Sequence, residues 1–156
     1  MDKYLNRLTR RVESSLVKGF EKRQGRLKEA CYYALSVKGK RLRPLLFLTL
    51  LEALEKDPRD FLDIAAAIEY IHTYSLIHDD LPAMDDDDVR RGKPTVHVQF
   101  DEPIALLAGD TLLTMAFERI ARSDLAPETV VDILKILTGC IGLEGMACGQ
   151  ALDIDF

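Results

Sequence analysis

The sequence predicts an all-α protein, and three observations support that prediction. Apolar residues recur at three- and four-residue steps along most of the chain, which is the period of amphipathic helices. No stretch alternates apolar and polar residues as a half-buried strand would. Asp57, Pro58 and Asp101 precede apolar stretches, at positions typical of helix N-caps and first turns. With 156 residues, the chain is expected to form a single domain over residues 1–156.

Four helices are expected in the first half of the chain. The first carries apolar residues at positions 5, 8, 12, 16 and 20 and has a basic outer face, and a shorter second helix covers residues 27–35. Gly39 ends the second helix, and Pro44 suits the first turn of a third helix that runs to about Leu54. Asp57 and Pro58 predict the start of a fourth helix, which leads into an acidic stretch.

The second half is expected to hold a loop and two long helices. Residues 92–95 form the loop, and Asp101 caps a helix that extends through about Ala121. The last helix is expected from Pro127 to near the end of the chain. It has four glycines that would share one face: Gly139, Gly142, Gly145 and Gly149. Because glycine in a helix costs about 1 kcal/mol relative to alanine, we expect a neighbouring helix or a ligand to approach the backbone along that face.

Composition excludes several classes of protein. The net charge of −5 argues against a nucleic-acid-binding protein. The N-terminus has no apolar signal region, and the longest apolar run, around residues 45–51, is too short to span a bilayer. Three cysteines (Cys31, Cys140 and Cys148) show no metal-ligand spacing and are expected to be reduced, buried thiols. We therefore expect a cytoplasmic protein without stable membrane anchoring.

The strongest chemical signal lies at the end of the fourth expected helix. Six aspartates fall within ten residues: Asp79, Asp80, Asp85, Asp86, Asp87 and Asp88. At about 100° per residue, His72 and Asp79 share a helix face, and Asp85 returns to them once Pro82 has disturbed the helix. Two carboxylates about 7 Å apart repel by roughly 2.4 kcal/mol at an effective dielectric of 20. A cluster that faces a cleft therefore requires cations, and hard oxygen ligands favour Mg²⁺.

Basic residues accompany the aspartates. Arg90 and Arg91 follow directly after Val89. They would repel a bare cation but attract an anion that is joined to the aspartates through a metal ion. A carboxylate–metal–phosphate arrangement therefore uses both signs of charge. Lys40, Arg41 and Arg43 lie at a helix junction, where free N–H groups and the positive end of the helix dipole favour an anion. For either cluster alone, a solvated turn or plain surface charge is the alternative.

Two other metal-binding classes fit the sequence less well. Glu69 and His72 form a Glu-x-x-His pair of the kind found in di-iron carboxylate bundles, but that architecture needs a second such pair, which the three histidines do not supply. An EF-hand is excluded because the aspartates lack the alternating spacing and the glycine of its loop.

The motifs and their order resemble the trans-isoprenyl diphosphate synthases, and most closely the bacterial farnesyl diphosphate synthases, or geranyltranstransferases. The matching stretches are GKRLRP at 39–44, HTYSLIHDD at 72–80, LPAMDDDD at 81–88, RRGKPT at 90–95, LAGD at 107–110, GM at 145–146 and GQ at 149–150. The resemblance implies antiparallel helices around a deep central cavity. It also implies Mg²⁺-dependent condensation of isopentenyl diphosphate with an allylic diphosphate, dimethylallyl or geranyl, to make farnesyl diphosphate.

The resemblance also implies roles for individual residues. Asp79 and Asp85 would be Mg²⁺ ligands with Asp80 in support, so these three aspartates would be the catalytic set, and Arg90 would hold the allylic diphosphate. The residues implied to hold isopentenyl diphosphate are Lys40, Arg43, His72 and Arg91. His72 is expected to act there as a hydrogen-bond donor and not as a general base; the alternative for it is a buried structural histidine.

Product length and completeness form the last group of expectations. Tyr74 and Ser75 would limit the growing chain, and Gln150 and Asp153 would line the cavity. The family's second aspartate-rich motif does not occur before Phe156, so the chain matches the N-terminal half of the fold, is expected to have little turnover alone, and is expected to pair as a homodimer. The alternatives are a geranylgeranyl diphosphate synthase, or a non-catalytic subunit or inactive fragment of a prenyl synthase.

Overall fold

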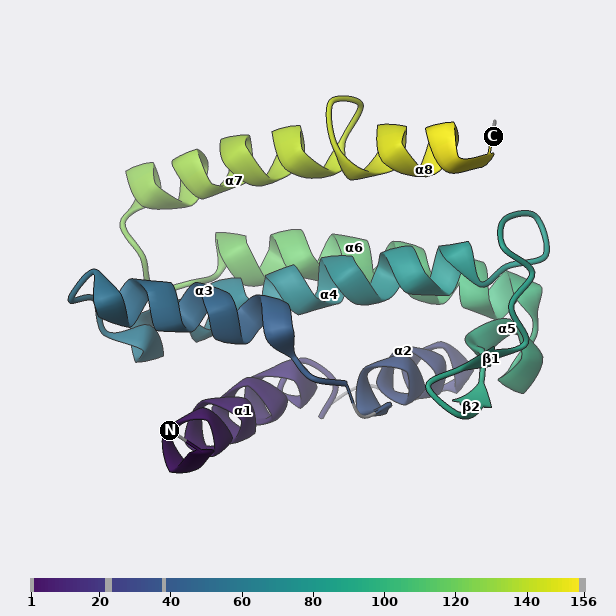
Figure 1. Cartoon of the computed structure of the whole chain (residues 1–156), viewed down its shortest axis with the longest axis horizontal. Coiled ribbons are helices and arrows are strands. Elements are labelled where there is room, and N and C mark those ends of the chain that lie inside the picture. The colour runs from purple at the N-terminus through teal and green to yellow at the C-terminus, as the bar shows by residue number, and fades with distance from the viewer. Residues whose placement is uncertain (1, 22–23, 38, 155–156) are drawn as a thin grey trace.

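The computed structural model describes residues 2–21, 24–37 and 39–154, and it confirms the all-α class (Figure 1). Within that part of the chain, no helix is both long and apolar enough to cross a bilayer. The elements in chain order are α1 (Asp2–Val17), α2 (Arg26–Ser36), α3 (Leu42–Ala53), the 3₁₀ helix η1 (Pro58–Phe61), α4 (Leu62–Asp79), β1 (Val89–Arg90), β2 (Lys93–Pro94), α5 (Val96–Gln99), α6 (Glu102–Ala121), α7 (Pro127–Ile141) and α8 (Met146–Ile154).

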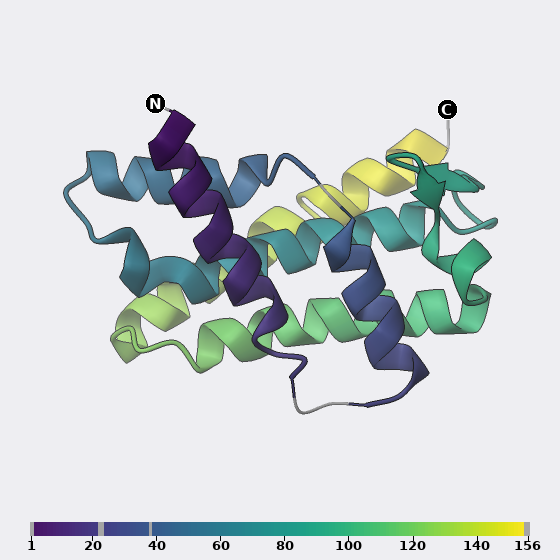
Figure 2. The ribbon, with the colours of Figure 1, turned by 90° about the horizontal axis from the view of Figure 1, so that it is seen from below.

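The helices lie in three layers, with α4 and α6 in the middle. Figure 1 shows α7 and α8 end to end along one side, and α1, α2, α5 and the short β-ribbon on the other. In Figure 2, α1 and α2 cross the line of α4 and α6 at a steep angle. Since α4 is covered on both sides, the acidic stretch at its C-terminal end lies where several elements meet.

Small side chains allow α4 and α6 to pack closely along their length. Ala65, Ala66 and Ala67 of α4 are fully buried, as are Ala105 and several other positions of α6. A helix that is apolar on nearly all sides is expected to lie in the core, and α4 does so. Near the C-terminal end of α4 there is no room for a side chain at Gly109 of α6, because it would collide with the ring of His78.

The first expected helix packs through the residues that its apolar pattern predicted. Leu8, Val12, Leu16 and Phe20 are all buried, although α1 ends at Val17 and Phe20 lies in the following turn. The Phe20 ring meets Tyr70 of α4 edge to face, with 6.2 Å between ring centroids. Apolar pattern therefore located the core contact correctly, while the helix boundary was three residues too long.

The predicted caps are confirmed. The Asp57 side chain accepts from the backbone N–H of Arg59, and the Asp101 side chain accepts from the N–H of Ile104 at 2.8 Å. The fourth helix begins as the 3₁₀ helix η1 before it continues as α4. Pro44 lies in the first turn of α3, as expected, and it is buried.

The loop expected at residues 92–95 is instead the second half of a small hairpin followed by the short helix α5. Val89 pairs with Pro94 and Arg90 with Lys93, so Arg91 and Gly92 form a two-residue turn. Both turn residues have positive φ, 53° and 74°, the backbone that matches the twist of a tight hairpin. Strands of two residues are too short to show an alternating pattern, so only the Arg-Gly pair signalled the turn.

The expectation of one continuous last helix is wrong. The helix breaks between Ile141 and Met146, which separates α7 from α8. A side chain at Gly145 would collide with the backbone carbonyl of Cys140, whereas Gly139 and Gly149 face open space. The glycines therefore permit a sharp break and do not provide a face for a close neighbour. The cysteine expectation holds for Cys31 alone, since Cys140 is exposed and Cys148 is partly exposed.

Candidate functional site

The C-terminal end of α4 turns back on itself and brings two aspartates together. Asp80 caps the helix, and the backbone N–H of Asp85 donates to the carbonyl of Asp79 at 2.8 Å. Asp86 then adopts a left-handed backbone with φ 53°, and its N–H donates to the carbonyl of Leu81. The reversal after Pro82 therefore returns Asp85 to the level of Asp79, as the sequence indicated.

The two aspartates at the helix end are partly or fully buried and have different partners. Burial raises the pKa of Asp79, the Asp85 charge raises it further, and a hydrogen bond donated by Gln150 of α8 lowers it. Burial also raises the pKa of Asp80, while the guanidinium of Arg90, which donates to its carboxylate at 2.6 Å, lowers it. Both carboxylates thus lie in surroundings where an additional cation would favour the charged form.

The remaining aspartates, Asp85 to Asp88, are exposed. Within residues 2–21, 24–37 and 39–154, no group of three or more acidic, histidine or cysteine side chains is close enough to hold a metal ion. Mg²⁺ is usually bound through one or two carboxylates, with water and substrate phosphates completing its shell. Asp79 and Asp85, placed together by the turn, fit that donor set, and a bound diphosphate would supply the missing oxygens.

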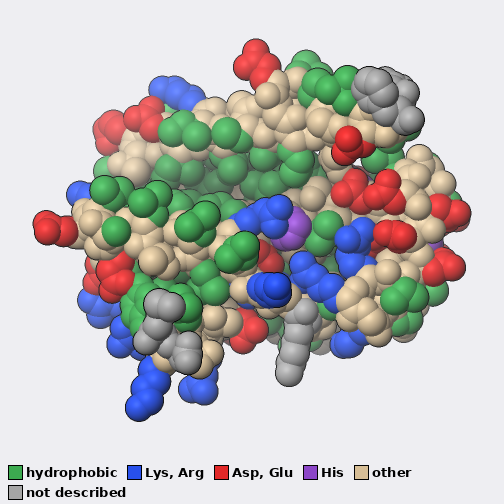
Figure 3. Space-filling view, viewed as in Figure 1, with side chains coloured by type: hydrophobic (Ala, Val, Ile, Leu, Met, Phe, Trp, Pro, Cys, Tyr) green, Lys and Arg blue, Asp and Glu red, His purple; other side chains and the backbone are tan. Residues whose placement is uncertain are grey.

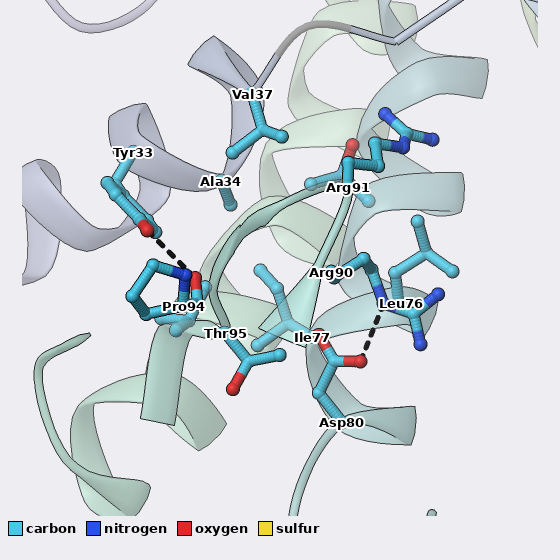
Figure 4. Close-up of a pocket in the computed structure, with 12 residues that line it drawn as sticks. Tyr33, Ala34, Val37, Leu76, Ile77, Asp80, Arg90, Arg91, Pro94 and Thr95 are labelled. Carbon is cyan, nitrogen blue, oxygen red and sulfur yellow. Dashed lines mark hydrogen bonds and ion pairs between the residues drawn. The ribbon is translucent and has the colours of Figure 1, made fainter. Parts of the chain in front are cut away.

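The hairpin carries two arginines that point in different directions. Figure 4 shows the Arg90 side chain at the Asp80 carboxylate and the Arg91 guanidinium directed away from it. The hairpin is held from α2 by Tyr33, whose hydroxyl donates to the carbonyl of Pro94 at 2.8 Å. A small cavity of about 40 Å³ lies between these residues. Adjacent arginines therefore serve two different places, Arg90 the aspartates and Arg91 the basic residues described next.

A hollow of about 440 Å³, here called the basic hollow, lies beside the aspartates. Figure 3 shows lysine and arginine side chains gathered around a histidine there, with acidic side chains next to them. A side chain at Gly39 would collide with the Arg91 guanidinium, so the absence of one lets Arg91 reach the hollow. The lining residues are Gly39, Lys40, Arg41, Leu42, Arg43, Glu69, His72 and Arg91. All four residues implied to hold isopentenyl diphosphate are thus in one place.

His72 is half-buried at the floor of the basic hollow. Burial, followed by the positive charges of Arg43 and Arg91, lowers its pKa to about 4, so the imidazole is neutral near pH 7. Arg43 Nη1 lies 3.1 Å from His72 Nε2. Because a guanidinium has only donors, Nε2 is the acceptor and the ring proton is on Nδ1. Without a ligand, Nε2 therefore accepts from Arg43; a role as donor to a bound anion stays a prediction.

The Glu69-x-x-His72 pair is explained by arginine contacts. The Glu69 carboxylate is buried against Arg41, with 2.9 Å between Oε1 and Nη1, and His72 accepts from Arg43. Both side chains therefore help to build the basic hollow. The di-iron interpretation has no support from their surroundings, because Arg41 and Arg43 bring positive charge to the same atoms.

The residues implied to set product length lie on α4, four and five residues before Asp79. Tyr74 is half-buried and meets the His78 ring edge to face, with centroids 5.7 Å apart. Ser75 is buried, and its hydroxyl donates to the carbonyl of His72 at 3.0 Å. Neither residue lines the basic hollow. Of the two residues on α8, Gln150 contacts Asp79 while Asp153 is exposed.

Sequence reasoning missed the role of two residues in this region, Arg41 and Tyr33. The sequence shows Arg41 only as part of a basic run, but its side chain is only 4% exposed, and no sequence pattern gives Tyr33 a role. A signal existed for Arg41, since Glu69 falls on the His72 face of α4 and a buried glutamate requires a cation. No local signal marked Tyr33, because its partner is the backbone carbonyl of Pro94, 61 residues along the chain.

Comparison with known proteins places this site in a family context. The family model described as polyprenyl synthetase matches residues 24–156. A farnesyl diphosphate synthase of Geobacillus stearothermophilus is 48% identical over 99% of this chain and 54% of its own length. The chloroplastic geranylgeranyl pyrophosphate synthase 7 of Arabidopsis thaliana is 46% identical over 83% of this chain and 38% of its own length.

A solved structure agrees with these sequence relatives. The apo crystal structure of an FPP/GFPP synthase from Zymomonas mobilis superposes with a TM-score of 0.93 at 38% sequence identity, and the match covers 99% of this chain and 57% of that one. The chain thus spans about half the length of proteins such as the G. stearothermophilus synthase.

Proposed function

The chain belongs to the polyprenyl synthetase family, and we propose that it supplies the diphosphate-binding residues of a prenyltransferase that makes farnesyl diphosphate. The substrates would be isopentenyl diphosphate and an allylic diphosphate, dimethylallyl or geranyl. One observation carries the proposal: the aspartates at the end of α4 and the basic hollow lie side by side on one face, with Arg90 directed to the first and Arg91 to the second (Figures 3 and 4).

In this proposal the basic hollow binds the diphosphate of isopentenyl diphosphate. Lys40, Arg43 and Arg91 supply positive charge, and His72, which is neutral near pH 7, supplies a polar group at the floor. Charge-assisted hydrogen bonds from guanidinium groups to phosphate oxygens are among the strongest that side chains make. On binding, Arg43 would exchange its contact with the neutral His72 ring for a contact with an anion, which favours the bound state.

The aspartates bind the second diphosphate through metal. We propose that Asp79 and Asp85 ligate Mg²⁺, that Asp80 keeps Arg90 in place, and that Arg90 contacts the allylic diphosphate. Mg²⁺ held there would neutralise the charge of the diphosphate leaving group. Gln150 donates to Asp79 in the unliganded protein, so it would have to release one carboxylate oxygen when the metal binds.

The reaction needs no nucleophile from the protein. The C–O bond of the allylic diphosphate breaks and diphosphate departs, the alkene of isopentenyl diphosphate attacks the allylic carbon, and loss of a proton restores a double bond. The chain's own residues would fix the two diphosphates at adjacent places, so that the reacting carbons are held together and water is excluded. Cys31, Ser75 and the other possible nucleophiles are not required for any of these steps.

A second candidate is a geranylgeranyl diphosphate synthase, and the 46% identity to the A. thaliana protein supports it. Both candidates use the same two diphosphate sites and differ in product length. We propose farnesyl as the product because Tyr74 places a bulky side chain near the aspartates, where the Asp79 charge contributes to raising its hydroxyl pKa after burial.

The decisive experiment is a product-length assay with labelled isopentenyl diphosphate, dimethylallyl diphosphate and Mg²⁺. It should compare the 156-residue chain with any longer protein that contains it, because the relatives are about twice as long. We expect a C15 product from the longer protein, little turnover from the chain alone, and a homodimer in analytical ultracentrifugation. A longer protein that binds neither substrate would contradict the proposal, and a C20 product would favour the second candidate.

A further inference from the structure

The basic hollow contains a buried ion pair that does not face its opening. Arg41 Nη1 and Glu69 Oε1 are 2.9 Å apart, and the two side chains are 4% and 3% exposed. Burying two charges is costly, and a buried ion pair is often no more stable than apolar residues in its place. Its presence in the wall of this hollow therefore calls for a reason other than stability alone.

The Arg41 guanidinium joins three helices at one point. Its backbone is left-handed, with φ 48°, and directly precedes α3. Its Nη2 donates to the carbonyl of Leu35, near the C-terminal end of α2, at 2.5 Å, where helix carbonyls lack partners within the helix. Glu69 lies on α4. A left-handed backbone is strained at a residue other than glycine, and here two contacts of the guanidinium, to Glu69 and to Leu35, hold it in place.

Residues 39–43 and α4 are joined by a second contact, one helical turn further along α4. Arg43 donates to His72 at 3.1 Å, and this contact is open to the hollow, whereas the contact of Arg41 with Glu69 is closed. The two pairs run in parallel, since Arg43 is two residues after Arg41 and His72 is one helical turn after Glu69. A fixed inner pair and an accessible outer pair are what a preformed anion site requires.

We propose that Arg41 and Glu69 are positioning residues of the basic hollow: the buried pair fixes residues 39–43 against α4, so that Lys40 and Arg43 face a bound diphosphate together with His72. This inference rests on the proposed function, and it adds that the anion site is built before the ligand arrives. The pair does not contact the ligand. Among the described residues, four cations and one carboxylate line the hollow, so these side chains leave a net charge of about +3 for the anion when Glu69 has neutralised Arg41.

Glu69→Gln separates a positioning role from a purely electrostatic one. If Glu69 acted only through its charge, its neutralisation would make the hollow more positive and would strengthen the binding of pyrophosphate. If it positions Arg41, the substitution frees the 39–43 segment and weakens binding despite the added positive charge. We expect affinity for inorganic pyrophosphate, measured by calorimetry with a chelator present, to fall about tenfold, because small displacements of charged groups have effects of this size or larger.

Arg119 provides a matched control. Like Arg41, it is a largely buried arginine that joins three helices, through Ser15 of α1 and Asp63 of α4, and in both residues Nε is buried without a hydrogen-bond partner. It lies outside the hollow. Arg41→Lys and Arg119→Lys should both lower the unfolding temperature, but only Arg41→Lys should weaken pyrophosphate binding, again by about tenfold.

The outcomes distinguish this inference from the proposed function. If Lys40→Ala abolishes pyrophosphate binding while Glu69→Gln and Arg41→Lys leave it unchanged or strengthen it, the hollow binds the anion but the positioning role is wrong. If the wild-type chain binds no pyrophosphate, both proposals are overturned. Should a variant fail to fold, hydrogen exchange of the wild type decides: the amide of Leu45, which donates to the carbonyl of Arg41 at 3.1 Å, must be protected before pyrophosphate is added, and protection that arises only on binding would overturn the inference.

Discussion

The two halves of the site differ in how complete they are without a ligand. The basic hollow is closed from behind by the Arg41–Glu69 pair, and Gly39 leaves room for Arg91 to reach it. The acidic half has a fixed part, Asp79 and Asp80 at the end of α4, and an exposed part, Asp85 to Asp88. Its fixed carboxylates contact Gln150 and Arg90, and the proposed metal would displace Gln150 from one oxygen of Asp79.

Under the proposed function, the difference follows from the sign of the charge that each half would bind. An anion site can be preformed, because two factors reduce the repulsion between its arginines and lysines. One is the charge of a buried glutamate, and the other is the solvation of the long side chains. A divalent cation site with all its carboxylates pressed together would repel itself in the metal-free protein. In the proposed function, leaving Asp85 exposed and Asp79 hydrogen-bonded would avoid that repulsion until metal and diphosphate bind together.

The largest effect should come from the acidic half. Asp79→Asn removes a proposed metal ligand and should lower kcat by about 10³-fold in a protein that contains this chain and turns over. Pyrophosphate binding to the metal-free protein should not weaken, because the basic hollow is intact. Steady-state kinetics with labelled isopentenyl diphosphate measure the first effect, and calorimetry measures the second.

Asp86→Asn is the control for that variant. It removes the same charge from the same run, and asparagine tolerates the left-handed backbone found there, φ 53°. We expect kcat to change by less than about fivefold, since Asp86 is exposed and is not a proposed ligand. Equal losses in Asp79→Asn and Asp86→Asn would mean that the run acts through its total charge and not through placed ligands.

The second largest effect should come from the basic hollow and should appear in a different kinetic constant. Arg43→Ala is expected to raise KM for isopentenyl diphosphate by about 10²-fold with a much smaller change in kcat, because it removes a contact made equally in the ground and transition states. KM for the allylic substrate should stay nearly constant. Arg122→Ala, an exposed arginine at the end of α6, is the control, and a rise in both KM values for Arg43→Ala would contradict the separation of the two halves.

A third test concerns what lies beneath the acidic half. Tyr74→Ala removes a half-buried ring one turn before the aspartates, and we expect products longer than C15 in thin-layer or mass-spectrometric analysis. Tyr32→Ala, which truncates an exposed tyrosine of α2, should leave the product unchanged. A purely C15 product from Tyr74→Ala would show that another residue limits the chain.

The parts of the fold that depend on local chemistry could be predicted from the sequence. Asp57 and Asp101 were recognised as caps because an N-cap acts within three residues of itself, and the apolar period located the buried face of α1. The break between α7 and α8 was missed because steps of three and four between Gly139 and Gly149 also describe one helix face. Only the backbone shows that Gly145 lies against the carbonyl of Cys140.

The same distinction between local chemistry and tertiary packing applies to the site. That Asp79 and Asp85 meet follows from a helix end and a proline three residues after it, both of which are local. That Lys40, Arg43, His72 and Arg91 meet depends on contacts between α2, α3, α4 and the hairpin, which no periodicity encodes. The sequence marked each of these four residues as a candidate, but only the resemblance grouped them in one site. For the pair behind them it offered only the position of Glu69 on the His72 face, because burial of a charged pair is decided by tertiary packing.

The smallest expected effect is a pH dependence of stability with opposite signs in the two halves. The pKa of His72 falls from 6.5 to about 4 on folding, chiefly through burial and then through Arg43, so between these values the unfolded state binds more protons and stability decreases as the pH falls. The pKa of Asp79 and of Asp80 is raised by burial, so the folded state takes up those protons first and stability increases as the pH falls through their raised values.

Urea unfolding at pH 7, 5.5 and 4.5 should therefore show a shallower loss of stability in His72→Gln than in wild type and a steeper one in Asp79→Asn. Identical slopes in all three proteins would mean that neither the histidine nor the aspartate differs enough from its unfolded state to support the contrast between a preformed hollow and an incomplete acidic half.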